Sequence, residues 1–400
     1  MAPAPSGRRF TVLGIGLLAL LAAGAWADIA TGGRWLDWCF DQLAHFFYEQ
    51  PLLAAVRRPG QLVLFRAHLA IALALAACGL VCARGLSGHG RRLWVVFWVA
   101  YAIRATIWTI GGNLPLVPGD SSHYIEVATS IYRGEGPVKH YVESYFRDYP
   151  AIRAGRGVLD DWATPLYSYV LAAAYRLTGV NPGESLEQTV AVAKGVSFLC
   201  NLLALPVLYG LARRRLGMEV ALAATAALAI LPVHALYAGF ALRESFVALT
   251  ALLAIWFLTE LWSTTSPARW AWAVACGLAG GLAILVRNTS MALMAAAWLY
   301  GVFAHGKRHF GPLLVAGAVI AAVISPWAWA TFQEYGEPFY TYTKYFQYNF
   351  SWTVHHYTQG TMRAADFYTW ANAPEIVRVK LKSLAIIVVY TLMILSPPLV

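Results

Sequence analysis

Long uninterrupted apolar runs constrain this chain more than any other feature of its sequence. A helix needs about 20 apolar residues to cross the hydrocarbon layer of a bilayer. Ten runs reach or approach that length, at 10–27, 62–83, 93–111, 190–211, 218–239, 245–262, 270–286, 289–304, 311–330 and 383–400. Charged residues make up 12% of the chain, against roughly 25% in soluble domains. The sequence therefore predicts an all-α polytopic membrane protein with about ten transmembrane helices.

The basic residues give the runs a direction. Arg8-Arg9, the stretch 84–92, Arg213 to Arg215, Arg269 and the cluster 307–309 lie at alternate ends of successive runs. This pattern fits cytoplasmic loops under the positive-inside rule better than a nucleic-acid surface, so no nucleic-acid partner is expected. The outer segments are then the long loops 28–61, 112–189 and 331–382, and short turns near 240–244 and 287–288.

Two features of the termini bear on the number of spans. Residues 7–27 read either as an uncleaved helix, which we favour, or as a signal peptide, and both place residue 28 outside. The last run stops abruptly at Val400, and ten spans need not be the whole protein. Long ordered loops on one face usually carry function, so we expect the site on the outer face.

The first long outer loop carries acidic residues at the starts of two expected amphipathic helices. Asp120 precedes a helix expected at 121–132, whose apolar stripe includes Tyr124. A structural interpretation makes Asp120 the N-cap of this helix. Asp160 and Asp161 precede a second amphipathic helix in "TPLYSYVLAAAYRLTG". These paired acids suit either a helix dipole or a divalent cation.

Ionisable residues also lie at the other outer boundaries. Arg243 and Glu244 form either a structural ion pair or part of a functional site. Arg287 either extends toward the headgroups or binds a lipid phosphate. His355 and His356 lie among aromatic residues of the last long loop, as a buried pair or as metal ligands.

Several of these segments, taken in order, resemble a known family. "GDSSHY", "TPLYSYVLAAAYRLTG", "LARRRLG", "YAGFALRESF", "GLAGGLAILVRNTS" and "ISPWAWATFQEYGEPF" follow one another from about residue 93 to at least residue 356. This order resembles membrane glycosyltransferases of the GT-C superfamily, in the branch of protein O-mannosyltransferases and lipid A aminoarabinose transferases. The resemblance divides the chain into two N-terminal helices, 1–92, and a GT-C-like catalytic module, 93–400.

The resemblance implies roles for five residues. Asp120 matches the acidic residue after the first family helix, and Glu244 matches the acidic residue opening a later span; both are candidate catalytic residues. Asp161 and His355 fall near positions of family metal ligands, so a divalent cation is an expected alternative. Arg287 falls near a basic residue implicated in binding the donor phosphate.

Two departures from the family pattern concern the same loop. The usual Asp-Glu pair is Asp120-Ser121 here, and the basic residue that often follows the second acid is replaced by Trp162-Ala163. Phosphate coordination from this loop is therefore in doubt. Arg243 and Tyr124 are further candidates for binding the substrate.

The expected function follows from this resemblance. The chain would transfer a sugar, with inversion, from a polyprenyl-phosphate donor to an envelope acceptor on the outer face of a bacterial inner membrane. No nucleotide cofactor is needed, because the lipid carries an activated sugar. The alternatives are a flippase or transporter of a lipid-linked glycan and a non-catalytic scaffold. A transporter requires charged residues inside its spans, and Arg66, His68 and Arg104 are the residues in such positions.

Overall fold

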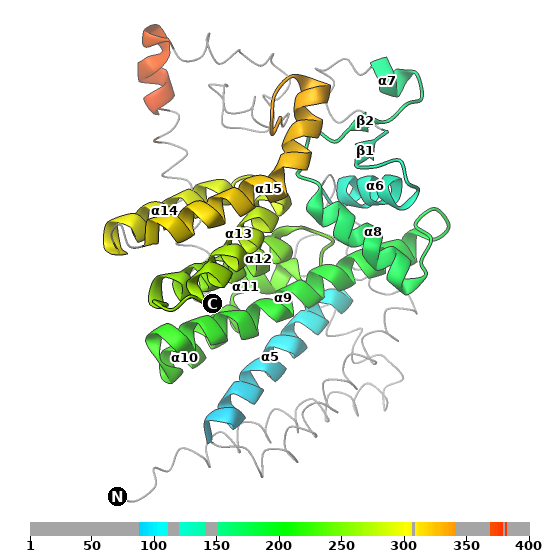
Figure 1. The fold of residues 1–400 in the computed structure, drawn as a ribbon. Coiled ribbons are helices and arrows are strands. Elements are labelled where there is room, and N and C mark those ends of the chain that lie inside the picture. Colours follow the sequence, from blue (N-terminus) through cyan, green and yellow to red (C-terminus); the bar gives the residue numbers. More distant parts are fainter. Residues whose placement is uncertain are drawn as a thin grey trace, which may run out of the picture. The chain divides into compact units, whose positions relative to one another are not determined.

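The computed structural model describes residues 88–110, 120–140, 150–305, 309–340, 369–378 and 381 (Figure 1). The chain divides into two compact units. The first comprises residues 1–125 and 174–256, and the second comprises residues 126–173 and 257–400. The predicted spans at 10–27, 62–83 and 383–400 lie outside the described residues.

In the first unit, three helices pack around small residues. They are α5 (Gly88–Ile110), α9 (Leu186–Leu216) and α10 (Met218–Ile230), with the short α11 (Pro232–Tyr237) after them. α10 contacts both α5 and α9. Ala100, Leu205 and Ala229, one from each helix, form a buried cluster. Side chains this small allow the helix backbones to approach closely, as in other membrane bundles.

In the second unit, the helices α13 (Arg269–Val286), α14 (Ser290–His305) and α15 (Phe310–Tyr335) follow one another with short connections. α15 ends at Gly336, whose φ of 74° is left-handed and whose N–H donates to the Phe332 carbonyl. The same unit holds α7 (Pro150–Arg153) and η4 (Trp370–Asn372). Three helices run from one unit into the other: α6 (Asp120–Tyr132), α8 (Leu166–Thr178) and α12 (Glu244–Ser263).

Four of the described helices are long and apolar enough to cross a membrane: α9, α12, α13 and α15. The protein is therefore mostly helical, as predicted, but the expected total of ten spans is not confirmed. α10 and part of α14 are apolar but shorter. α5 is not one of these four helices, and Arg104 lies in its interior.

The structure corrects the sequence analysis at two places. The predicted continuous span 218–239 is broken at Leu231, which is extended, and Pro232 begins the separate helix α11. Proline lacks the N–H that would bond back to residue 228, which explains the break. The charged part of the first long loop was expected without strands. It forms a two-stranded antiparallel ladder, β1 (Val138–Lys139) with β2 (Val158–Leu159).

Glycines set the closest helix contact of the second unit. Gly277 and Gly281 lie one turn apart on α13 and face α15. A Cβ built on Gly277 would lie 2.6 Å from both the Ala316 carbonyl oxygen and the Val319 Cβ. One on Gly281 would lie 2.7 Å from the Val323 Cβ. This spacing is the small-xxx-small pattern that lets membrane helices pack through their backbones.

We therefore expect Gly277→Val to destabilise the purified protein. Overpacking of this kind costs about 1–3 kcal/mol, and thermal unfolding in detergent would measure it. Gly195→Ala is the matched control, because its new Cβ would lie 3.5 Å from Trp108, an ordinary contact. Equal stability of the two variants would contradict the packing described here.

Candidate active site

Asp120 lies at the start of α6, and the structural interpretation of the sequence makes it the N-cap of this helix. The structure makes Asp120 the first residue of the helix itself, half-buried. Within the part of the chain that is described, its carboxylate makes no hydrogen bond or ion pair, so it does not cap the helix. The positive end of the helix dipole favours the charged carboxylate at this position.

Tyr124 connects α6 to the turn before α12. It follows Asp120 by four residues, so both lie on the same face of the helix. The Tyr124 side chain is fully buried, and the guanidinium carbon of Arg243 lies 5.4 Å from the centroid of its ring. This is a cation–π distance. The contact places Arg243, which directly precedes α12, against the Tyr124 ring of α6, and Glu244 is the first residue of α12.

Four of the residues singled out in the sequence belong to the first unit: Asp120, Tyr124, Arg243 and Glu244. Arg243 and Glu244 are half-buried. The cation–π contact between Arg243 and Tyr124 joins the helix that begins at Asp120 to the turn before Glu244. The basic-loop pattern predicts that this turn lies on the outer face.

Arg104, the charged residue that the sequence left unexplained, has a structural role. It is fully buried, and its guanidinium donates to the carbonyls of Leu228 and Ala229 at 3.3 and 2.8 Å. These carbonyls precede the α10–α11 break, where Pro232 removes a helical donor. Arg104 also donates to the side-chain oxygen of Asn201 at 2.5 Å, the Ala100 carbonyl at 3.0 Å and His234 Nδ1 at 2.9 Å. All five of its N–H groups are therefore accounted for.

In the second unit, Asp161 forms an ion pair with Lys139 of β1. Both side chains are fully buried. Asp160, also buried, accepts a hydrogen bond from the backbone N–H of Trp162 at 2.9 Å. The family pattern has a basic residue after the second acid, where this chain has Trp162-Ala163. Lys139 thus supplies a positive charge beside Asp161 from a different part of the chain. No local sequence pattern indicates this pairing, because the two residues are 22 positions apart.

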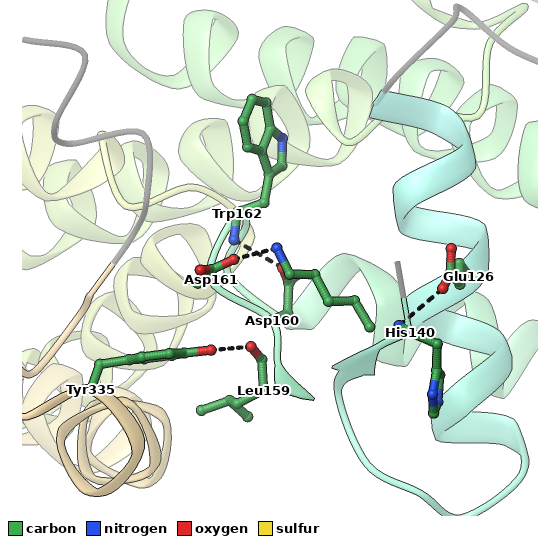
Figure 2. Close-up of polar contacts among 8 residues, drawn as sticks. Glu126, His140, Leu159, Asp160, Asp161, Trp162 and Tyr335 are labelled. Carbon is green, nitrogen blue, oxygen red and sulfur yellow. Dashed lines mark hydrogen bonds and ion pairs between the residues drawn. The ribbon is translucent and has the colours of Figure 1, made fainter. Parts of the chain in front are cut away.

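The segment holding this pair is fastened on two sides (Figure 2). The Tyr335 hydroxyl, at the end of α15, donates to the carbonyl of Leu159 in β2. The backbone N–H of His140 donates to Glu126 of α6 at 3.1 Å. The ladder between β1 and β2 joins the two attachments.

Of the two predicted metal ligands, Asp161 does not fit a cation in this arrangement. The ammonium group of Lys139 occupies the Asp161 carboxylate, and a nearby positive charge opposes the binding of a divalent ion. Among the described residues, no three His, Cys, Asp or Glu side chains gather as a metal site. His355, the other predicted ligand, lies outside the described residues.

Arg287 lies in the second unit, at the predicted turn. It directly follows α13, is half-buried, and has an extended backbone. Its N–H donates to the Ala283 carbonyl at 3.0 Å, and its own carbonyl accepts from Ser290 N–H at 2.9 Å. The backbone of the turn is thereby fixed, with Arg287 at the junction of α13 and α14.

Comparison with known protein families shows which family the central segment of the chain matches. Residues 163–329 match the family model described as dolichyl-phosphate-mannose-protein mannosyltransferase. The resemblance to the GT-C mannosyltransferases is confirmed. This GT-C segment is somewhat less than half of the 400-residue chain, and it contains Arg243, Glu244 and Arg287 but not Asp120. No curated protein matches the chain.

Solved structures give a weaker likeness. An Archaeoglobus fulgidus oligosaccharyltransferase tethered to an acceptor peptide is 18% identical with a TM-score of 0.47, over 59% of this chain and 30% of its own. Archaeal oligosaccharyltransferase AglB from the same organism, in complex with an inhibitory peptide and a dolichol-phosphate, is 21% identical with a TM-score of 0.46, over 60% and 29%. The chain spans about a third of the length of these proteins. A likeness this weak transfers neither fold nor activity to this chain.

The buried ion pair makes a testable prediction about stability. Lys139→Met should lower the free energy of unfolding by roughly 3–5 kcal/mol, because Asp161 would remain buried without its partner. Replacing both residues, as Lys139→Met with Asp161→Leu, should restore much of the loss. Unfolding by SDS titration from detergent micelles measures both.

Arg92→Met is the control for this prediction. It breaks the exposed pair that Arg92 forms with Glu219 at 3.2 Å, and it should cost about 1 kcal/mol or less. If Lys139→Met were as well tolerated as Arg92→Met, the Lys139–Asp161 pair would not hold this segment together.

Proposed function

We propose that this chain transfers a sugar from a polyprenyl-phosphate donor to an envelope acceptor, with inversion at the sugar carbon. The match of residues 163–329 to the mannosyltransferase family supports the lipid-linked donor. The observation that carries the proposal is the contact of Arg243 with Tyr124. It joins the helix that begins at Asp120 to the turn that carries Arg243 and Glu244.

The chemistry of the proposed reaction sets what the residues must do. An acceptor hydroxyl attacks the anomeric carbon as the bond from that carbon to the phosphate oxygen breaks. The hydroxyl proton passes to a general base, and the polyprenyl phosphate leaves with the bonding electrons. Asp120 is the proposed base, because its carboxylate has no partner in the described structure. Glu244 is the second candidate.

The leaving phosphate gains negative charge and needs a cation. Arg243 is proposed to bind it from the turn before α12, and Arg287 is proposed as a further phosphate ligand from the turn after α13. Tyr124 orients Arg243 through its ring. No step is routed through a metal, because Lys139 occupies the carboxylate of Asp161. A nucleotide cofactor is not required, since the donor sugar arrives already activated.

The proposed location is the outer, periplasmic face of a bacterial inner membrane. Arg213, Arg214 and Arg215 lie in the last turn of α9, and Arg269 begins α13. Positive residues favour the cytoplasmic side. The opposite ends of these helices would then face outward, and α13 ends there at Arg287.

The flippase alternative receives less support than the transferase. It relied on charged residues inside spans that line a polar pathway. Arg104, one of the three such residues, donates to five acceptors of its own unit, so its charge is already solvated by the protein. Arg66 and His68 lie outside the described residues.

Asp120→Asn tests the proposed base. The substitution keeps the shape of the side chain but removes the proton acceptor, and should lower the rate of transfer by roughly 10²–10⁴-fold. The measurement is the initial rate of mannose transfer from dolichyl-phosphate-mannose to an envelope extract, by protein reconstituted in nanodiscs. Binding of dolichyl phosphate should remain close to that of the wild type.

Glu184→Gln is the matched carboxylate-to-amide control. Glu184 is exposed and accepts a hydrogen bond from Asn181 at 2.8 Å, which a glutamine oxygen also accepts. The control should keep the wild-type rate. If Asp120→Asn also kept it, Asp120 would not be the base and Glu244→Gln would be tested next. Full activity in both variants would contradict the proposal that either carboxylate is the general base.

A further inference from the structure

The turn that carries Arg243 and Glu244 is bonded to one face of α9. Ser197 Oγ donates to the Leu242 carbonyl at 3.0 Å, immediately before Arg243. Asn201 Nδ2 donates to Ser245 Oγ at 3.1 Å, immediately after Glu244. Ser197 and Asn201 are one helical turn apart, and both are fully buried. The pair therefore holds the turn on both sides of the two charged residues.

Asn201 links this turn to the break between α10 and α11. Its Nδ2 also donates to the His234 carbonyl at 2.6 Å, and its side-chain oxygen accepts from Arg104. Arg104 in turn donates to His234 Nδ1. Since arginine only donates, that nitrogen must be the acceptor, and His234 is neutral with its proton on Nε2. The side-chain amide of Asn201 thus bonds both the His234 carbonyl, just after the α10–α11 break, and Ser245 at the start of α12.

The backbone of the same turn also lies very close to α5. A Cβ on Gly239 would be 2.8 Å from Ile107 Cγ2 and 3.3 Å from the Ile107 carbonyl oxygen. Leu242 N–H donates to the Phe240 carbonyl at 2.9 Å within the turn. Contacts with α5 and α9 therefore leave the segment between α11 and α12 little freedom to move.

Hydrogen bonds of this kind are costly to leave unmade, because buried polar groups without partners lose their solvation. A transferase gains from holding its carboxylate and cation in one geometry, and small misplacements cost rate rather than binding. We propose that Ser197 and Asn201 are positioning residues, which set Glu244 and Arg243 through the α11–α12 turn. This proposal rests on the proposed function of that turn.

The sharpest variant releases the turn without disturbing Arg104. Ser197→Ala with Ser245→Ala removes one bond on each side of Arg243 and Glu244 and leaves the Asn201–Arg104 contact in place. We expect kcat for dolichyl-phosphate-mannose to fall roughly 10–100-fold. KM should stay near the wild-type value, because the donor site itself keeps its residues.

The matched control removes two buried hydroxyls that bond only within their own helical turns. Thr189 and Thr225 are fully buried and donate to Ser185 and Ala221 carbonyls at 2.6 and 2.7 Å. Thr189→Val with Thr225→Val should leave kcat within about twofold of wild type, since nothing in the α11–α12 turn changes. A fall in kcat equal to that of the serine pair would overturn the positioning role.

A double-mutant cycle separates positioning from general weakening of the fold. If the serines act through Glu244, their removal should cost much less in the Glu244→Gln background than in the wild type. If the combined variant instead lowers kcat by the product of the two separate fold-decreases, the proposal would be overturned. Asn201→Asp, which keeps an acceptor for Arg104 but loses both N–H donors, should repeat the behaviour of the serine pair.

Hydrogen exchange gives a readout that does not depend on activity. Peptides covering residues 238–247 should exchange several-fold faster in the serine double variant, while peptides from α13 stay unchanged. Unaltered exchange in the turn would overturn the proposal. A wild-type protein without any turnover of the donor would contradict the proposed function alone, and faster exchange would still support the anchoring by Ser197 and Asn201.

Discussion

The break between α10 and α11 depends on a donor for the carbonyls that Pro232 leaves unbonded, and Arg104 provides it. In an apolar helical layer there is no water to replace a missing helical hydrogen bond. The Arg104 guanidinium donates to the carbonyls of Leu228 and Ala229, and it also donates to the side-chain oxygen of Asn201. The short helix α11 can therefore leave the helix axis of α10 with both of these carbonyls hydrogen-bonded.

The same requirement shapes the charged loop of the second unit. Asp161 is buried, and a buried carboxylate needs an opposite charge or several donors. Lys139 supplies the charge from a strand that is itself held by the ladder and by His140. In both units a buried cation thus bonds groups that precede a helix: Arg104 bonds carbonyls before α11, and Lys139 bonds Asp161 before α8. The proposed catalytic carboxylates, Asp120 and Glu244, are the first residues of two other helices, α6 and α12.

The long apolar runs allowed much of the helical structure to be read from sequence. α9, α12, α13 and α15 lie within a few residues of their predicted bounds, and both amphipathic helices were found from their 3.6-residue pattern. The break at Leu231 was missed because the run 218–239 is mostly apolar and long enough for one span, although it contains Pro232. Lys139 and Arg104 were missed as structural partners, since no local pattern encodes a contact over 22 or about a hundred positions. Sequence could select candidate residues, but their partners depend on tertiary contacts.

The central claim is that the chain consumes a polyprenyl-phosphate sugar by inverting transfer. The most direct measurement is the fate of dolichyl-phosphate-mannose incubated with the purified protein in nanodiscs and an envelope extract. Mass spectrometry would follow the lipid, and NMR would give the anomeric configuration of the product. We expect dolichyl phosphate to form in step with a mannosylated product of the opposite configuration. Donor that stays intact, or a product that keeps the configuration of the donor, would contradict the account.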